Sequence, residues 1–420
     1  MSEMEGTRRV QINNSALRMI YAMSFIDLFA VGVIFPFLGP YVKSLGCTDT
    51  QVGIFGSAYA ALQVISGPII GSWSDIRGRK SILFVTLMIS TVLYFLMGFC
   101  TTLISLLILR LLLGIFKHTQ TLNKAIITDL TGNDKQLNMA VYGRCTSFAS
   151  IGFVFGPMVS GHLSEFDNAL QYICSLTAFL FVVNTILAYC LPNLKPTCSR
   201  QNRTARNELK IVVQDLRAVN WTNHWGAFLL KFFYIFVTTM FFSTQPFYLS
   251  EMFDAGKLEV GYVISLVSLV GVICGFCMSR FTILFYGVNE TATLRTYHMF
   301  LLLTICFIGF LSVRNIFVFA LLLVPFGVCN AVLRIVTMEL VVAKCKDHER
   351  GSLTGASDSM MSLGRFLAPM TAGILADKSS TGGVMLYAAL FSLLGTGVAY
   401  HLYAIDKLEA KYHGDGDKTD

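Results

Sequence analysis

The feature that most constrains this chain is a series of long apolar runs that recur along its whole length. A spanning helix needs roughly 20 predominantly apolar residues. Twelve runs of about that length can be marked: 16–39, 51–70, 81–100, 102–125, 141–163, 169–192, 225–247, 260–282, 296–313, 315–338, 352–376 and 381–404. The sequence therefore predicts an all-α integral membrane protein with twelve transmembrane helices.

Composition supports the membrane assignment independently. Of the 420 residues, 54% are hydrophobic and only 14% are charged, and the mean hydropathy is +0.63. A soluble chain carries about 25% charged residues. The first run lacks the short apolar core and the small-residue cleavage site of a signal peptide, so we expect it to be a retained span.

The placement of Lys and Arg predicts the orientation in the membrane. Cytoplasmic connections carry an excess of these residues. If the N-terminus is inside, most of them fall in the inner connections, and the outer ones hold only Lys43, Lys257, Arg314 and Lys378. Both termini are then cytoplasmic, and the net charge of +7 requires no nucleic-acid partner. Nothing in the sequence distinguishes the plasma membrane from an endomembrane.

A polar, basic stretch divides the chain into two halves. We expect an N-terminal six-helix half at 1–192, a cytoplasmic linker at 193–224, a C-terminal six-helix half at 225–404 and a cytoplasmic tail at 405–420. Within the linker, Leu209, Val212, Val213, Leu216 and Val219 follow helical spacing. That spacing predicts a short amphipathic helix on the inner leaflet, and a plain spacer is the alternative.

An internal repeat supports the division into halves. Four residues recur at one constant displacement: Gly143, Gly152, Pro157 and Gly161 return as Gly355, Gly364, Pro369 and Gly373. Parallel repeats of six spans are one architecture of secondary transporters.

The connection at 71–80 is unusually specific for a short loop between two spans. It contains Gly71, Asp75, Arg77, Gly78, Arg79 and Lys80. Asp75 can pair with Arg79 or with a facing cation, and glycines permit tight turns and close helix approach. We interpret the loop as a gate between two arrangements of the helices. A static determinant of topology is the alternative.

The fifth run is rich in small residues, namely Gly152, Gly156 and Gly161, with Pro157 among them. Small residues let membrane helices pack closely, and proline removes one helical hydrogen bond. We expect a helix-packing motif here, and ordinary membrane packing explains the same residues.

These motifs resemble those of the major facilitator superfamily. The loop matches that superfamily's Gly-x-x-x-Asp-x-x-Gly-Arg-Lys signature, and Arg110-Leu-Leu-Leu-Gly114 resembles its Arg-containing motif. The first run and the Gly-rich fifth run resemble tetracycline-type drug/proton antiporters. The resemblance implies two six-helix repeats, with spans 1, 4, 7 and 10 lining a central cavity. The second-half counterpart of the loop, Gly275 to Arg280, lacks the Asp.

Ionisable residues within the apolar runs are the candidate substrate and proton sites, because each costs about 2.5–3.5 kcal/mol at a helix centre on insertion scales. They are Asp27, Arg110, Lys117, His118, Lys231, Arg334, Asp358 and Arg365. Arg110, Lys117 and Lys124 follow spacing that predicts one face of an unbroken fourth helix. The balance is positive, which favours an anionic substrate, whereas the antiporter resemblance favours a cation or zwitterion.

Together these features predict a secondary active transporter of a small organic solute that works by alternating access and is coupled to protons. A passive uniporter and a non-transporting receptor or scaffold are the alternatives. We find no nucleotide-binding loop, zinc-site spacing or nucleophile elbow, so we expect no enzyme activity, catalytic residue, metal or cofactor. The expected partners are a small-molecule substrate, protons and membrane lipid, and the expected state is a monomer. Cys47 and Cys100 fall on the same predicted side, where a disulfide is conceivable.

Overall fold

The computed structural model describes all residues except 1–13, 133, 193–220, 288–290, 344–349 and 417–420. The described part is helical throughout and contains no strand. Its helices are α1 (Asn14–Ser44), α2 (Asp49–Arg77), α3 (Arg79–Met97), α4 (Leu103–Phe116), α5 (Thr119–Thr131), α6 (Lys135–Leu163), α7 (Ala169–Cys190), α9 (Trp221–Phe253), α10 (Lys257–Tyr286), α11 (Ala292–Ser312), α12 (Ile316–Ala343) and α13 (Arg350–Gly416).

The helices match the twelve predicted spans, except that α13 contains two spans and that α4 and α5 divide the fourth span between them. Ten helical stretches of the described chain are long and apolar enough to cross a membrane. One of them, 355–408, contains the last two predicted spans, which are separated at Ser380, where φ is +69°. The more polar α6 covers the predicted fifth span but is not among the ten. The all-helical, twelve-span expectation is confirmed.

The fourth predicted span is broken rather than continuous. Helix α4 ends at Phe116 and α5 begins at Thr119, with Lys117 and His118 between them in non-helical conformations. The prediction that residues 110–124 form one helical face is therefore wrong. Helix α13 continues to Gly416 and so includes most of the predicted tail. Most of the predicted linker, including its amphipathic helix, lies outside the described residues.

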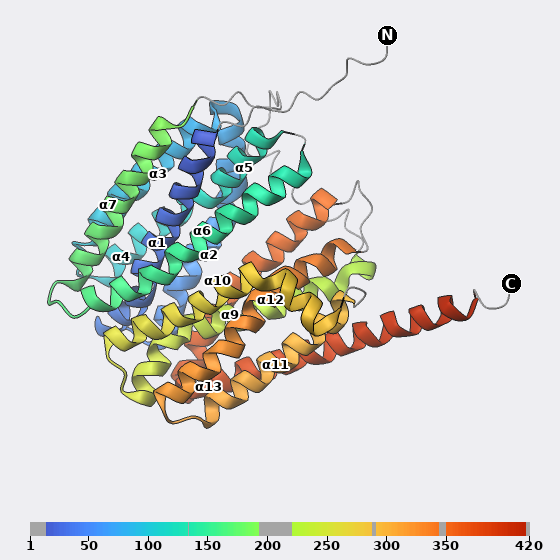
Figure 1. The fold of residues 1–420 in the computed structure, drawn as a ribbon. Helices are drawn as coiled ribbons and strands as arrows, with labels where there is room; N and C mark the ends of the chain where they lie inside the picture. Colours follow the sequence, from blue (N-terminus) through green and yellow to red (C-terminus); the bar gives the residue numbers. More distant parts are fainter. Residues whose placement is uncertain (1–13, 133, 193–220, 288–290, 344–349, 417–420) are drawn as a thin grey trace, which may run out of the picture.

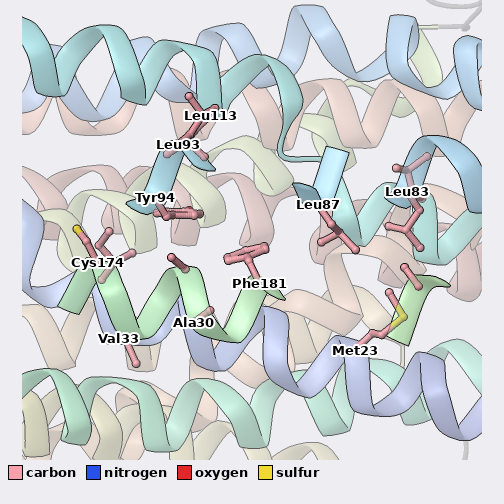
Figure 2. Close-up of a cluster of buried hydrophobic side chains, with 14 of the residues drawn as sticks. Met23, Ala30, Val33, Leu83, Leu87, Leu93, Tyr94, Leu113, Cys174 and Phe181 are labelled. Carbon is pink, nitrogen blue, oxygen red and sulfur yellow. The ribbon is translucent and has the colours of Figure 1, made fainter. Parts of the chain in front are cut away.

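Two groups of helices lie side by side, α1–α7 and α9–α13 (Figure 1). The first group has one core of buried hydrophobic residues drawn from residues 16 to 191. Tyr94 and Phe181 stack in this core with ring centroids 5.1 Å apart (Figure 2). The second group has its own buried clusters from residues 227 to 402. We refer to these groups as the N half and the C half.

The twelve spans run in alternating directions, with α4 and α5 together forming one span and α13 forming two, so α1 begins at the end of the bundle where α13 finishes (Figure 1). We call this the terminal end. The opposite end, which carries the connections 45–48, 164–168 and 254–256, is the far end. By the charge argument, the terminal end is the one expected to face the cytoplasm.

Two seams at the far end join the halves: α2 packs on α13, and α6 packs on α10. The same pattern of contacts occurs in both. A β-carbon on Gly53 would overlap the carbonyl of Pro369, and one on Gly261 would overlap the carbonyl of Pro157. The repeat seen in the sequence thus places Pro157 and Pro369 at corresponding points of the two seams.

Candidate functional site

Lys117 and Asp27 form a buried ion pair in the N half. The Nζ atom of Lys117 lies 3.2 Å from the Oδ1 atom of Asp27, and their side chains are 7% and 1% exposed. The ammonium also lies 5.4 Å from the centre of the Phe181 ring. The second carboxylate oxygen of Asp27 has no hydrogen-bond partner in the described part of the chain.

The break between α4 and α5 positions Lys117. Its carbonyl accepts a hydrogen bond from Nε2 of Gln63, because the break leaves that carbonyl outside the helical ladder. His118, the next residue, lies 2.8 Å through Nε2 from the hydroxyl of Ser66. His118 is therefore a buried residue that fixes the break against α2, and no contact between it and Asp27 is described. Side chains from α2 thus hold the lysine at the ion pair.

Arg110 lies in the same half but does not bind the Asp27 carboxylate. Its guanidinium carbon is 4.2 Å from the centre of the Tyr59 ring, a cation–π distance. The buried Nε atom of Arg110 has no partner among the described residues. Asp27 therefore neutralises Lys117, and the guanidinium of Arg110 packs on the face of the Tyr59 ring instead.

The C half contains a second buried lysine with different surroundings. The Nζ atom of Lys231 donates to the hydroxyl of Thr337 at 3.3 Å, and the residue is only 6% exposed. Beside it, the hydroxyl of Tyr234 donates to the side-chain oxygen of Asn330 at 2.8 Å. The charged groups that act on Lys231 electrostatically are Asp358, Arg365 and Arg334.

Asp358 lies between the two halves rather than within the C half. Its carboxylate is 4.0 Å from the ammonium of Lys124, which belongs to α5. Both side chains are about half exposed, at 55% and 51%. This pair between the halves is therefore long and solvated.

The 71–80 loop is a compact ionic junction within the N half. Arg79 begins α3 and lies 2.8 Å from Asp75 of α2 and 2.5 Å from Asp129 of α5. Gly78 forms the turn between α2 and α3 with φ at +92°, a conformation that favours glycine. The ammonium of Lys80 lies 5.7 Å from the ring of Tyr189, and Arg77 is exposed at the end of α2.

Gly71 does not have the close approach that its motif suggests. A β-carbon there would meet nothing within 4 Å. Asp75 also takes its described ion pair from Arg79 of its own half rather than from the C half. In this arrangement of the helices the junction ties α2, α3 and α5 together.

The Gly-rich segment of α6 packs against both halves. A β-carbon on Gly156 would lie 2.6 Å from the Cα atom of Gly32, and one on Gly152 would overlap the carbonyl of Phe25. At Gly161 the nearest neighbour would be Leu258 of α10, at 3.1 Å. The segment therefore presents one surface to α1 and another to the C half.

Sequence reasoning missed several residues. Asp377 accepts hydrogen bonds from the backbone amides of Asp49 and Thr50, both at 2.9 Å, and so caps α2 from the other half. No local pattern predicts a partner this distant in sequence. Tyr59 and Thr337 were missed because uncharged polar residues are common within apolar runs. Cys47 and Cys100 are free, so the conceivable disulfide is not formed.

A model of the "Major Facilitator Superfamily" matches residues 20–289 and 292–418. The chain belongs to the major facilitator superfamily. Solute carrier family 22 member 18 of Rattus norvegicus is 25% identical over 90% of this chain and 92% of its own length. Multidrug resistance protein 1 of Bacillus subtilis is 25% identical over 87% of this chain and 90% of its own. Tetracycline resistance protein, class H, of Pasteurella multocida is 28% identical over 46% of this chain and 49% of its own.

Solved structures of the superfamily share the fold of this chain. The human organic anion transporter MFSD10 aligns with a TM-score of 0.68 at 18% identity, covering 92% of this chain and 99% of that one. The nucleoside transporter NupG aligns with a TM-score of 0.72 at 16% identity, covering 93% and 99%. At these identities the likeness shows the fold alone, and the family match identifies the chain as a membrane transporter of some solute.

Proposed function

We propose that this major facilitator protein is a proton-coupled secondary transporter of a small organic solute. The observation that carries the proposal is the buried pair of Lys117 and Asp27 at the break between α4 and α5. A buried carboxylate with one unpartnered oxygen is a place where a proton can bind. The names of the relatives include drug resistance, organic anion and nucleoside transport, so they support transport without selecting a substrate.

Protonation of Asp27 changes the electrostatics of the N half in one step. The proton binds the free oxygen, the carboxyl group becomes neutral, and the ionic part of its interaction with Lys117 is lost. The ammonium is then a buried charge without a counter-ion, which is costly. A rearrangement that brings Lys117 to water or to an anionic substrate group relieves this cost. Proton binding and movement of the halves are thereby linked.

Alternating access fits the distribution of contacts between the halves. Both close seams lie at the far end, and the Lys124–Asp358 pair toward the terminal end is long and solvated. Rocking of the halves about a central site would separate these seams and bring the terminal end together. The junction of Asp75, Arg79 and Asp129 would act as the gate on that side. Large apolar side chains such as Phe317 and Leu284, 81% and 79% exposed, would contact lipid around a monomer.

The experiment compares wild type with Asp27→Asn in reconstituted vesicles. An untargeted metabolite comparison of vesicles with and without the protein, at two pH values, first identifies the solute. Solute exchange and uptake driven by a pH gradient are then measured separately. We expect Asp27→Asn to keep exchange and to lose proton-driven accumulation. Asp167→Asn, which changes an exposed carboxylate in the far-end connection, is the control and should keep both.

A second variant tests the lysine of the pair. Lys117→Gln should weaken binding of the native solute more than it destabilises the fold. Intact accumulation by Asp27→Asn would contradict the proton-carrier role. Transport by wild type that ignores the pH gradient would indicate the passive uniporter, and no solute flux at all would indicate the receptor or scaffold.

A further inference from the structure

We propose that the C half holds an anion-binding subsite centred on Lys231, with Arg334, Arg365 and Thr337 around it, and that the transported solute carries a carboxylate, sulfonate or phosphate group. This proposal rests on the transport function proposed above and adds the chemical class of the substrate. It places the recognition of the substrate in the half of the molecule that does not hold the Asp27–Lys117 pair.

The first observation is the contrast between the two buried lysines. Lys117 has a carboxylate at 3.2 Å, whereas the described partners of Lys231 are the neutral hydroxyl of Thr337 at 3.3 Å and the ring of Tyr234, whose centre is 6.0 Å away. An ammonium has three protons to donate and accepts none, so Thr337 satisfies one donor of Lys231. The residue is 94% buried, since its exposed fraction is 6%. A buried cation without a counter-ion is strongly unfavourable, and an anionic ligand supplies the missing charge.

The second observation is the sign of the charges around Lys231. Among the described residues, Arg334 and Arg365 act on the charge of Lys231 with the same sign, and Asp358 acts with the opposite sign. The carboxylate of Asp358 is 55% exposed and its described ion pair is with Lys124 of the other half. Arg334 and Arg365 therefore add positive charge to the surroundings of Lys231, and the carboxylate of Asp358 also faces a cation of the other half. The cluster has room for at least one negative charge from a ligand.

The third observation is the way the helices present these groups. Asn330, Arg334 and Thr337 follow i, i+4, i+7 on α12 and so share one face, and Lys231 donates to that face from α9. The hydroxyl of Tyr234, one turn further along α9, binds Asn330. Arg334 and Arg365 are exposed to solvent, whereas Lys231 is not. The same face of α12 thus carries the exposed cation Arg334 and the hydroxyl that binds the buried ammonium of Lys231.

The probes for the test are two xanthene dyes with the same ring system and opposite charge. Fluorescein is an anion at neutral pH, and a rhodamine ester is a cation. Binding to the purified full-length protein is measured by fluorescence polarisation. We expect wild type to bind fluorescein and Lys231→Met to bind it at least tenfold more weakly. Lys231→Arg should restore binding, and Lys407→Met, a cation change near the end of α13, should not alter it.

Thermal stability gives a second readout that does not depend on the choice of dye. Lys231→Met removes an unpaired buried charge, so its melting temperature without ligand should equal or exceed that of wild type. Lys117→Met strands the Asp27 carboxylate, so its melting temperature should fall. Fluorescein should raise the melting temperature of wild type and leave that of Lys231→Met unchanged, because a ligand stabilises only a state that binds it.

Three outcomes would overturn the subsite. The first is equal binding of fluorescein by wild type and Lys231→Met, and the second is tighter binding of the cationic dye than of fluorescein. The third is a loss of stability in Lys231→Met that Asp358→Asn also shows and that does not increase when the two changes are combined. The last would show that Asp358 is the true partner of Lys231. Asp27→Asn separates the two proposals, because it should lose proton coupling and keep fluorescein binding. Failure of proton coupling alone therefore leaves the subsite standing.

Discussion

A β-carbon built on Gly261 would overlap the backbone carbonyl of Pro157. Helices α10 and α6 therefore approach each other more closely at this point than any residue type other than glycine would allow. The same relationship joins Gly53 of α2 to Pro369 of α13. Both contacts lie at the far end, and both join one half to the other. Close packing of small residues is a principal source of helix association in membranes. Closure of the far end therefore depends on these two glycines.

Gly261→Ala should shift the protein towards a form with the far end open, because the added methyl group cannot be accommodated against backbone atoms. Gly271→Ala is the matched control on the same helix, since a β-carbon there would meet nothing within 4 Å. Ser160 lines a pocket of about 150 Å³ at the seam and is 1% exposed. A cysteine placed at Ser160, with the accessible native cysteines replaced, reports opening by its reaction rate with a polar thiol reagent. We expect faster reaction in Gly261→Ala, and equal rates in both variants would contradict the closure role.

The Asp27–Lys117 pair should show strong energetic coupling. Removal of one partner leaves an uncompensated buried charge, which costs about 3–5 kcal/mol. Asp27→Asn and Lys117→Met should each lower the free energy of unfolding by an amount of that order. The double variant should be less destabilised than the sum of the two, because it leaves no buried charge. Denaturation of the four proteins in detergent measures the cycle, and strictly additive losses would show that the two side chains do not interact.

Two carboxylates bind Arg79, and we expect them to serve different purposes. Asp129 is 8% exposed and should contribute to stability, so Asp129→Asn should cost about 1–3 kcal/mol. Asp75 is 31% exposed, and an exposed pair is worth at most about 1 kcal/mol. Asp75→Asn should keep the fold and the substrate affinity and reduce turnover. Denaturation and initial transport rates distinguish the two roles, and an unchanged rate in Asp75→Asn would leave it a determinant of topology.

Asp377 should hold the α2–α13 seam through its two hydrogen bonds to the first turn of α2. A carboxylate at a helix N-terminus is favoured by the helix dipole, so Asp377→Asn weakens the contact without changing its shape. Glu165, which corresponds to Asp377 in the sequence repeat, offers the matched control Glu165→Gln. Spin labels on the exposed residues Phe166 and Phe317 report the distance between the halves at the far end. We expect a larger population of long distances in Asp377→Asn, and the same distribution in both variants would argue against the cap.

Orientation in the membrane stays a prediction from the Lys and Arg distribution. Epitope tags at both termini and within 195–207 should be reached by antibodies only after the cell membrane is permeabilised. Attachment of a glycan at Asn202 or Asn289 in cells would reverse the assignment, because both fall on the predicted cytoplasmic side.

The spans were predictable because hydrophobicity is a local property of the sequence. A run of apolar residues forms a membrane helix wherever it lies, and the constant displacement between Pro157 and Pro369 revealed the repeat. The break at Lys117 was not predictable, because it depends on Gln63 and Ser66 of another helix. The sequence placed Asp27 and Lys117 within apolar runs, and the superfamily resemblance placed both of their spans around one central cavity. It did not indicate which cation would lack a partner, because that depends on how α9, α12 and α13 pack.

The pairing of one ammonium with one carboxylate makes the Asp27–Lys117 site electrically neutral until a proton binds. Once Asp27 is protonated, the site carries one positive charge, and moving that charge across the full membrane potential is worth about 2.3 kcal/mol per 100 mV. A voltage that is negative on the side of the terminal end would therefore draw the protonated site towards that side and leave the unprotonated one unaffected. If Asp27 carries the proton as proposed, the Asp27–Lys117 pair should make the orientation of the carrier sensitive to membrane voltage as well as to pH.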